Sequence, residues 1–227
     1  EKIGVLLYMA ITLRLDIAVE TGKAASQQSH PTRRLMNKVD RIFEYLNGNP
    51  DLGIKYKASD MQLRAVCDAS YNSEPGARSR GGYVLHYGRV DEPEFMNGAA
   101  DARSNLLRYV ATSASEAEYM QTYETGKGTM AMKNIVEALG IKQHQIPIQN
   151  DNTPSVAIAT GQAKEKKTKH MDMRMNWLKE KVLRKILDVQ WSPGKTNVAD
   201  FLTKTLSECD FEYKRDQLMV DCSGIPV

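Results

Sequence analysis

The chain has 227 residues, of which 41% are hydrophobic and 26% are charged, with a formal net charge of +3. This length and composition allow a buried core, and the chain contains no apolar run long enough to cross a membrane and no signal peptide, so we expect a soluble globular protein without a membrane segment. Cys67, Cys209 and Cys222 lack C-x-x-C spacing, which excludes a disulfide framework or a zinc site and fits a reducing intracellular compartment.

The first quarter of the chain is predicted to be helical. Residues 3–18 are apolar at helical spacing, and residues 32–46 form a second segment that ends at an Asn-Gly-Asn-Pro terminator. We therefore expect residues 1–57 to form a small helical subdomain. Because the chain begins at Glu1 rather than Met, we also expect it to be a segment of a longer protein.

From residue 61 the pattern changes to strands. They are predicted over residues 61–68, 81–88 and 105–112, as an antiparallel meander separated by Gly, Pro and Asn. In the first strand residues 63, 65 and 67 point one way, whereas Asp68 points the other way with residues 64 and 66. Asp68 is therefore predicted to lie at the carboxyl end of this strand, where open α/β sheets place their ligand crevice.

The second half alternates helices with strands. Helices are predicted over residues 115–139, 153–160, 168–183 and 198–206, and strands over 146–150 and 187–191. Such alternation predicts an α/β domain with a mixed sheet, which we place at residues 58–206. Residues 207–227 are then a C-terminal tail.

Four acidic residues occur where these elements would bring them to one end of the sheet. Asp68 and Asp151 each end an apolar strand, Glu118 lies early in the long helix, and Asp200 opens the last helix. Converging carboxylates repel one another unless a cation neutralises them, and oxygen ligands without Cys or His select a hard ion. The pattern therefore predicts a Mg²⁺ or Mn²⁺ site.

Several alternatives compete with this assignment. Glu116 is two positions from Glu118, but with Ser115 as the helix N-cap it suits the first helical turn, so Glu118 is preferred. Asp151 could serve only as a carboxylate at the start of the next helix. Asp172 is a competing fourth acid, which we expect instead to cap or tether the basic helix.

Six short motifs occur in order along the chain. They are residues 67–71 (CDASY), 78–84 (RSRGGYV), 111–120 (ATSASEAEYM), 150–152 (NDN), 168–174 (TKHMDMR) and 197–204 (NVADFLTK). Together they resemble the ribonuclease H domain of copia-type (Pseudoviridae) LTR-retrotransposon Pol polyproteins. The segment in front, residues 1–57, resembles the C-terminal end of the reverse transcriptase, in its thumb or connection region. Residues 91–103 depart from the family, which usually has a tryptophan- and lysine-rich hairpin there.

The resemblance implies a ribonuclease H-like fold, with a five-stranded mixed sheet flanked by helices. It implies that Asp68, Glu118, Asp151 and Asp200 hold two Mg²⁺ ions, with Mn²⁺ as a substitute. The implied reaction is endonucleolytic hydrolysis of the RNA strand of an RNA/DNA hybrid during reverse transcription, leaving 5′-phosphate ends. The implied partners are the hybrid and the polymerase part of the same polyprotein, in a cytoplasmic virus-like particle or the nucleus.

A further set of residues is expected to contact the hybrid. Polar side chains beside the acids would reach 2′-hydroxyl groups in the minor groove, and basic side chains would hold phosphates. The set comprises Ser70, Asn72, Asn150, Asn152, Lys166, Lys167, Lys169, His170, Arg174 and Lys195. The basic run alone would also suit a solvated helix surface.

A second class of function stays open at this point. The chain could be a domesticated retroelement fragment that acts as a non-catalytic structural or RNA-binding subunit of a larger ribonucleoprotein assembly. The four retained acids oppose this hypothesis, because a scaffold gains nothing from their mutual repulsion. An integrase or resolvase with the same fold is a third hypothesis, disfavoured because such sites usually use three acids at different spacings.

Overall fold

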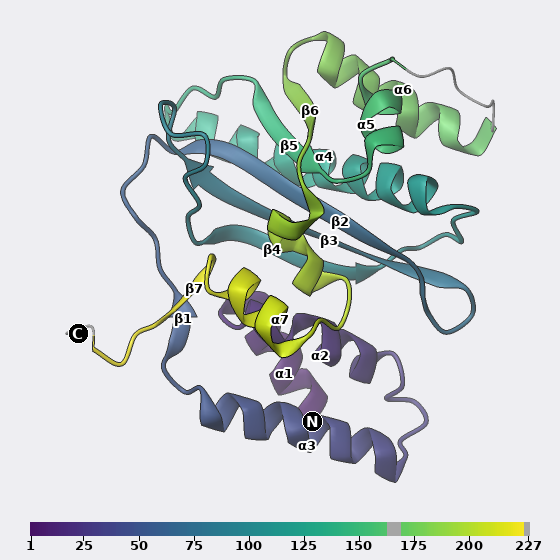
Figure 1. The fold of residues 1–227 in the computed structure, drawn as a ribbon, viewed down its shortest axis with the longest axis vertical. Helices are drawn as coiled ribbons and strands as arrows, with labels where there is room; N and C mark the ends of the chain where they lie inside the picture. The colour runs from purple at the N-terminus through teal and green to yellow at the C-terminus, as the bar shows by residue number, and fades with distance from the viewer. Residues whose placement is uncertain (163–168, 225–227) are drawn as a thin grey trace.

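The computed structural model describes residues 1–162 and 169–224, and its central element is a five-stranded sheet in the order β4-β3-β2-β5-β6 (Figure 1). The strands are β2 (Gln62–Glu74), β3 (Arg78–Gly88), β4 (Ala99–Leu106), β5 (Ile146–Asn150) and β6 (Leu187–Trp191). The first three pair antiparallel, whereas β5 pairs parallel with both β2 and β6. The predicted ribonuclease H-like arrangement, a meander followed by parallel strands, is confirmed.

Different elements cover the two faces of the sheet. One face carries α4 (Ala114–Ala138), α5 (Thr153–Ala159) and α6 (Lys169–Leu183). The other face carries the short turns η1 (Leu15–Ile17), η2 (Gly194–Thr196) and η3 (Val198–Leu202), with α7 (Glu208–Arg215) outside them. The alternation predicted for β2 explains this division, because Leu63, Ala65 and Cys67 join the α4 core whereas Val66 joins the other.

The N-terminal helices have a core of their own. They are α1 (Lys2–Thr12), α2 (Ala18–Ala25) and α3 (Arg33–Gly48), and their apolar faces meet around Leu6, Leu35 and Val39. The continuous helix predicted for residues 3–18 is interrupted after Thr12 and resumes through η1. In the residues that the structure describes, no helix is both long and apolar enough to cross a membrane.

The C-terminal segment pairs with the chain that follows the N-terminal helices. After α3 the chain forms β1 (Leu52–Ile54), which pairs antiparallel with β7 (Met219–Asp221) near the C-terminus (Figure 1). The predicted tail, residues 207–227, therefore contains a helix and a strand over its described part. Leu218 and Met219 are buried in the core on the η3 face of the sheet, so this segment belongs to the folded unit.

The third strand of the meander was predicted in the wrong place. The prediction was residues 105–112, but β4 spans Ala99–Leu106, and the chain from Leu107 to Thr112 is irregular. β4 is an edge strand in which polar residues alternate with alanines, so its hydrophobicity does not distinguish it from a loop. The unusual segment 91–103 thus supplies the first half of a strand.

Two predicted helix boundaries also require correction. The N-cap of α4 is Ser113 rather than Ser115, since the Ser113 hydroxyl accepts a hydrogen bond from the Glu116 backbone N–H at 3.1 Å. The helix predicted over residues 198–206 is only the short turn η3. Asn197 caps this turn by accepting from the Ala199 N–H at 2.9 Å.

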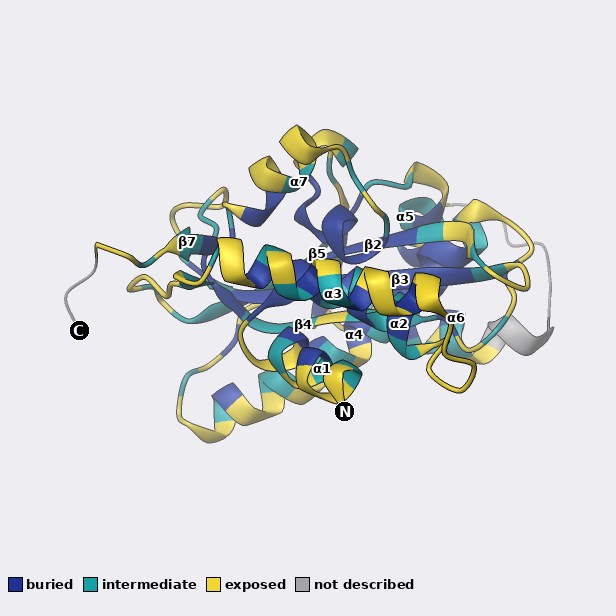
Figure 2. Ribbon diagram, turned by 90° about the horizontal axis from the view of Figure 1, so that it is seen from below, coloured by how far each residue is buried: buried dark blue, intermediate teal, exposed yellow. Residues whose placement is uncertain are grey.

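The strands β2 and β3 are the most deeply buried part of the sheet (Figure 2). Gly82 in β3 lets η3 pack closely against them. A Cβ atom at Gly82 would lie 2.8 Å from Leu202 Cβ and 3.0 Å from Thr203 Cγ2. Gly82 pairs with Asp68 across the strands. A side chain at position 82 would therefore push η3 away from the strand that carries Asp68.

We predict that Gly82→Ala lowers the free energy of unfolding by about 1–3 kcal/mol, because the added methyl group overpacks the contact with η3. Urea unfolding of the full chain measures this. Gly4→Ala is the matched control, since a Cβ at Gly4 meets nothing within 4 Å and alanine is the better helix former. Equal stability of the Gly82→Ala variant and wild type would contradict the prediction and show that the contact accommodates the added methyl group.

Candidate metal centre

Three aspartates from different elements converge at one end of the sheet. Asp68 lies in β2, Asp151 directly follows β5, and Asp200 lies in η3. One carboxylate oxygen from each lies within 4.8 Å of those of the other two. Because β2 and β5 are parallel neighbours, both deliver their acid to the same edge, and η3 brings the third across that edge.

Glu118 lies beside this cluster, in the second turn of α4. Its Oε1 accepts from the Ala69 backbone N–H at 3.2 Å, and its Oε2 accepts from the Asn150 amide at 3.0 Å. The side chain is 6% exposed. Burial, together with the charges of Asp68 and Asp151, raises the pKa of Glu118 to about 9. Without a cation this carboxyl group is therefore protonated at neutral pH.

Asp68 is the most buried of the aspartates, at 3% exposed. Its Oδ2 accepts a short hydrogen bond from the Thr203 hydroxyl, and Lys204 Nζ lies 3.9 Å away. Burial raises the pKa of Asp68 to about 6, and although Lys204 lowers it, Asp200 adds to the increase. Burial and the charge of Asp200 also raise the pKa of Asp151. The acids therefore interact electrostatically with one another.

Two lysines balance the charge of Asp200. Lys204 Nζ lies 2.8 Å from Oδ1, and Lys214 Nζ donates to Oδ2 at 2.9 Å. Lys214 is buried, at 4% exposed, and it comes from α7. Oδ1 itself is buried and accepts no hydrogen bond from the described residues. A cation that coordinates Oδ1 would therefore displace the ammonium group of Lys204, whose side chain is 41% exposed.

The residues present fit a hard divalent cation. Asp68, Asp151 and Asp200 offer converging carboxylate oxygens, one of them without a hydrogen bond, and Glu118 adds a fourth carboxylate nearby. An all-oxygen set of this kind is what Mg²⁺ and Mn²⁺ prefer. A cation would also relieve the repulsion that raises the pKa values of these groups.

The loop between β6 and η3 holds the site together. The Asn197 amide donates to the Cys67 carbonyl oxygen at 2.9 Å, which ties η3 to β2 next to Asp68. A Cβ at Gly194 would lie 2.6 Å from Asp151 Oδ2, so glycine at position 194 lets the loop pass close to that carboxylate without displacing it. Both contacts set the spacing between the acids.

The polar residues that were predicted to contact nucleic acid are placed in different ways. Asn150 is fully buried, and its amide donates to Glu118 rather than facing solvent. Asn152 caps α5 by accepting from the Ser155 N–H at 2.9 Å. Ser70 and the exposed Asn72 lie at an irregularity in the β2–β3 pairing, past Asp68.

The predicted basic residues do not form one group in the described structure. Lys195 is exposed in η2, near the loop beside Asp151. The Arg174 guanidinium lies 5.0 Å from the ring centre of Tyr109 and 6.0 Å from that of Tyr123, on the α4 face. Lys166 and Lys167 lie outside the described residues. The side chains of Lys169 and His170, in the first turn of α6, lie outside them as well.

The two acids that compete with the predicted metal ligands are Glu116 and Asp172. The Glu116 carboxylate accepts from the backbone N–H of Thr112, the residue before the N-cap Ser113, at 2.7 Å, so it holds the chain at the start of α4. This structural use agrees with the preference for Glu118. The side chain of Asp172 lies outside the described part of the chain.

Four residues of the site were not identified from the sequence. Asn197, Thr203 and Lys204 lie within the motif at residues 197–204, so the resemblance contained a signal that was used only for Asp200. Lys214 had no such signal, since it lies in the segment predicted to be a tail. Its role depends on a contact between segments that only the fold brings together.

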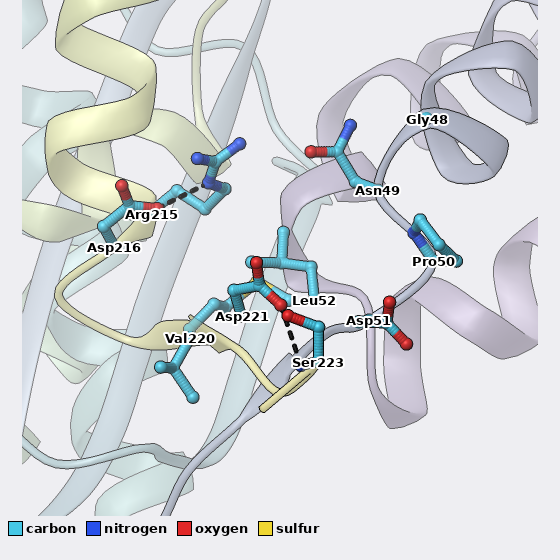
Figure 3. A pocket seen from close by; sticks show the side chains of 11 residues that line it. Gly48, Asn49, Pro50, Asp51, Leu52, Arg215, Asp216, Val220, Asp221 and Ser223 are labelled. Atoms are coloured by element: carbon cyan, nitrogen blue, oxygen red, sulfur yellow. Dashed lines mark hydrogen bonds and ion pairs between the residues drawn. The ribbon is translucent and has the colours of Figure 1, made fainter. Parts of the chain in front are cut away.

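A cavity of about 550 Å³ lies apart from the carboxylates (Figure 3). It opens between the end of α3 and the C-terminal segment. Its lining residues are Gly48, Asn49, Pro50, Asp51, Leu52, Arg215, Asp216, Met219, Val220, Asp221 and Ser223. None of the four predicted acids is among them, so the cavity is not part of the candidate metal centre.

Known proteins resemble the chain over most of its length. No family model matches it. It is 29% identical over 213 residues to the retrovirus-related Pol polyprotein from transposon TNT 1-94 of Nicotiana tabacum, covering 93% of this chain and 15% of that polyprotein. It is 26% identical over 213 residues to the corresponding polyprotein from transposon RE2 of Arabidopsis thaliana, covering 92% and 14%.

Solved structures show a partial likeness. The N-terminal RNase H domain of a Mycobacterium tuberculosis protein, solved as a fusion with maltose-binding protein, has a TM-score of 0.47 at 13% identity, covering 68% of this chain and 96% of that one. The sequence relatives are more informative, because they align with nearly all of this chain, which spans about one seventh of their length. The chain is therefore similar, over nearly all of its length, to a segment of transposon Pol polyproteins, in agreement with the resemblance to copia-type retrotransposons.

Proposed function

We propose that the chain is a metal-dependent endonuclease that hydrolyses the RNA strand of RNA/DNA hybrids. The observation that supports this proposal most directly is the convergence of Asp68, Asp151 and Asp200 to within 4.8 Å at the end of the central strands. The homology to transposon Pol polyproteins supplies the biological setting, since such elements replicate through a hybrid. The partner in that setting is the polymerase part of the same polyprotein, inside the cell.

The metal-binding groups in this proposal are Asp68, Asp151, Asp200 and Glu118. Two Mg²⁺ ions bound there would activate the attacking water and stabilise the leaving 3′-oxygen, leaving 5′-phosphate and 3′-hydroxyl ends. The protein itself contributes positioning and charge rather than a covalent intermediate. Mn²⁺ would substitute for Mg²⁺, because both ions accept an octahedral set of oxygen ligands.

The surrounding residues hold these carboxylates in place. The Thr203 hydroxyl fixes Asp68, and the Asn150 amide together with the Ala69 N–H fixes Glu118. Lys204, whose side chain is 41% exposed, places a positive charge at the edge of the cluster. A phosphodiester would meet this charge as it approaches the acids.

Contacts to the hybrid belong to the residues that remain accessible. Asn72, in the irregular part of β2, and Lys195, in η2, are exposed, so we assign them to the 2′-hydroxyl groups and the phosphates, respectively. Ser70 is half-buried beside Asn72 and belongs with it. Asn150 and Asn152 are occupied within the protein, and we assign them to the support of the site rather than to the hybrid.

We predict that wild type cleaves a labelled RNA/DNA hybrid in Mg²⁺ but not in Ca²⁺, which binds oxygen ligands without the tight octahedral geometry of Mg²⁺. Asp151→Asn should reduce cleavage by at least about 100-fold, since even groups that only support metal ligands contribute 10–100-fold. Gel analysis of the end-labelled RNA strand measures both effects.

Asp188→Asn is the matched control for this experiment. Asp188 lies on β6 near the end of the sheet opposite Asp151, where its carboxylate contacts Gln190. This variant should cleave at the wild-type rate. A chain that neither cleaves hybrids nor binds Mg²⁺ in calorimetry would instead favour the non-catalytic subunit.

The raised pKa values give a second prediction, which concerns stability without metal. Asp68 and Glu118 bind protons more tightly in the folded chain than in the unfolded chain. The stability they contribute is therefore complete below their unfolded pKa values and is lost as the pH rises through about 6 for Asp68 and about 9 for Glu118. In EDTA the free energy of unfolding should fall by roughly 1–3 kcal/mol between about pH 5 and pH 9.

Urea unfolding at a series of pH values tests this prediction. Glu118→Gln should flatten the part of the curve above about pH 7, because the amide does not titrate, and saturating Mg²⁺ should offset the loss in wild type. The prediction would be wrong if wild type and Glu118→Gln lost stability equally between pH 7 and 9.

A further inference from the structure

The C-terminal helix sends a buried lysine into the candidate metal centre. Lys214 of α7 is 4% exposed. Its ammonium group donates to the carbonyl oxygens of Gly194 at 3.0 Å and Asn197 at 2.7 Å, and to Asp200 Oδ2 at 2.9 Å. A lysine ammonium has three N–H groups, so these three acceptors use all of them.

All three acceptors belong to the segment that forms one side of the site. Gly194 lies against Asp151, since a Cβ there would be 2.6 Å from Asp151 Oδ2. Asn197 is joined through its side chain to the Cys67 carbonyl in β2, next to Asp68. Asp200 is itself one of the three clustered acids. A single ammonium group thus fixes the backbone on both sides of a proposed metal ligand.

The attachment of α7 does not depend on this lysine alone. Phe211 packs edge-to-face on Phe201, with ring centres 6.1 Å apart, and on Tyr45 at 6.3 Å. Arg215 donates to the Tyr45 hydroxyl at 3.2 Å and to Asp216 at 2.7 Å. Aromatic packing therefore already anchors the helix. A buried lysine ion pair contributes little to stability compared with an apolar residue of similar volume, so docking of α7 does not by itself explain Lys214.

Lys214 also decides which oxygen of Asp200 is available. Oδ2 is held by the Lys214 ammonium, whereas Oδ1 is buried without a hydrogen bond and lies 2.8 Å from Lys204 Nζ. Without Lys214, Oδ2 would be a buried anionic oxygen with no donor. The carboxylate would then turn to share both oxygens with Lys204, the remaining cation, and withdraw from Asp68 and Asp151.

We infer that Lys214 is a positioning residue for the metal centre: it holds Asp200 through Oδ2 and leaves Oδ1 for a divalent cation, which would displace the partly exposed Lys204 ammonium group. This inference rests on the proposed function and deepens it. It extends the catalytic unit past residue 206 to include α7. The alternative is electrostatic repulsion, in which the nearby ammonium group would only weaken binding of the cation.

Calorimetric titration of the metal-free full chain with Mn²⁺ tests the inference. We expect Lys214→Met to weaken Mn²⁺ binding by at least about 10-fold, the lower end of the effect of groups that support metal ligands. The Mg²⁺ concentration for half-maximal hybrid cleavage should rise by a similar factor, with recovery of the rate at high Mg²⁺. Unchanged affinity would overturn the inference. Tighter binding would also overturn it and would show that the ammonium group acts mainly by repelling the cation.

Arg215→Met is the matched control. Arg215 is the next residue of α7, is also buried, and points toward the separate cavity, where it pairs with Asp216 (Figure 3). Its loss should lower the melting temperature but leave Mn²⁺ affinity within about 2-fold of wild type, because it contacts none of the acids. Equal weakening in both variants would show that only the docking of α7 matters, and would overturn the inference.

Two further measurements keep the outcome clear. If Lys214→Met fails to fold by circular dichroism, Lys214→Gln is used under the same criterion, since its amide can still donate to one backbone carbonyl. Mn²⁺ binding does not require cleavage, so the inference and the proposed function fail separately. Weakened binding in the Lys214 variant, with no cleavage of hybrid by wild type, would reject only the nuclease.

Discussion

The mutual repulsion of buried carboxylates governs the arrangement around the end of the sheet. Asp68, Asp151 and Asp200 converge within 4.8 Å, and Glu118 is close enough that their charges raise its pKa. In a low-dielectric surrounding such a group is unfavourable unless each member has donors or a cation. The nearby hydroxyl, amide and ammonium groups, and the closeness of the loop before η3, all serve to keep these charges together.

The acids differ in the groups that donate hydrogen bonds to them or pair with their charge. Glu118 is held by neutral donors, a backbone N–H and the Asn150 amide, and its pKa is strongly raised. Asp200 lies between two ammonium groups, those of Lys204 and Lys214. The Glu118 side of the site is therefore easily protonated when no metal is present. Coordination of a cation by Glu118 would release that proton.

Much of this architecture follows from local sequence patterns. The strands β5 and β6 were predicted to the residue, because short apolar runs between turn signals have few alternatives. Asp68 and Asp151 stood out because they end such runs. β4 was misplaced because an edge strand has little apolar alternation, and Lys214 was missed because its partners are brought to it only by tertiary packing. Local periodicity does not encode which distant carbonyl groups a lysine will meet.

The candidate site depends on both ends of the chain. Consecutive residues of α7 point in different directions, Lys214 into the metal centre and Arg215 toward Tyr45 of α3. The same C-terminal segment continues into β7, which pairs with β1 directly after α3. The N-terminal helices, which resemble the end of a polymerase, therefore contact the element that fixes Asp200. α7 is one connection between the N-terminal helices and the segment that carries Asp200. Another is direct, because Lys23 of α2 donates to the Thr205 hydroxyl at 2.8 Å, three residues after η3.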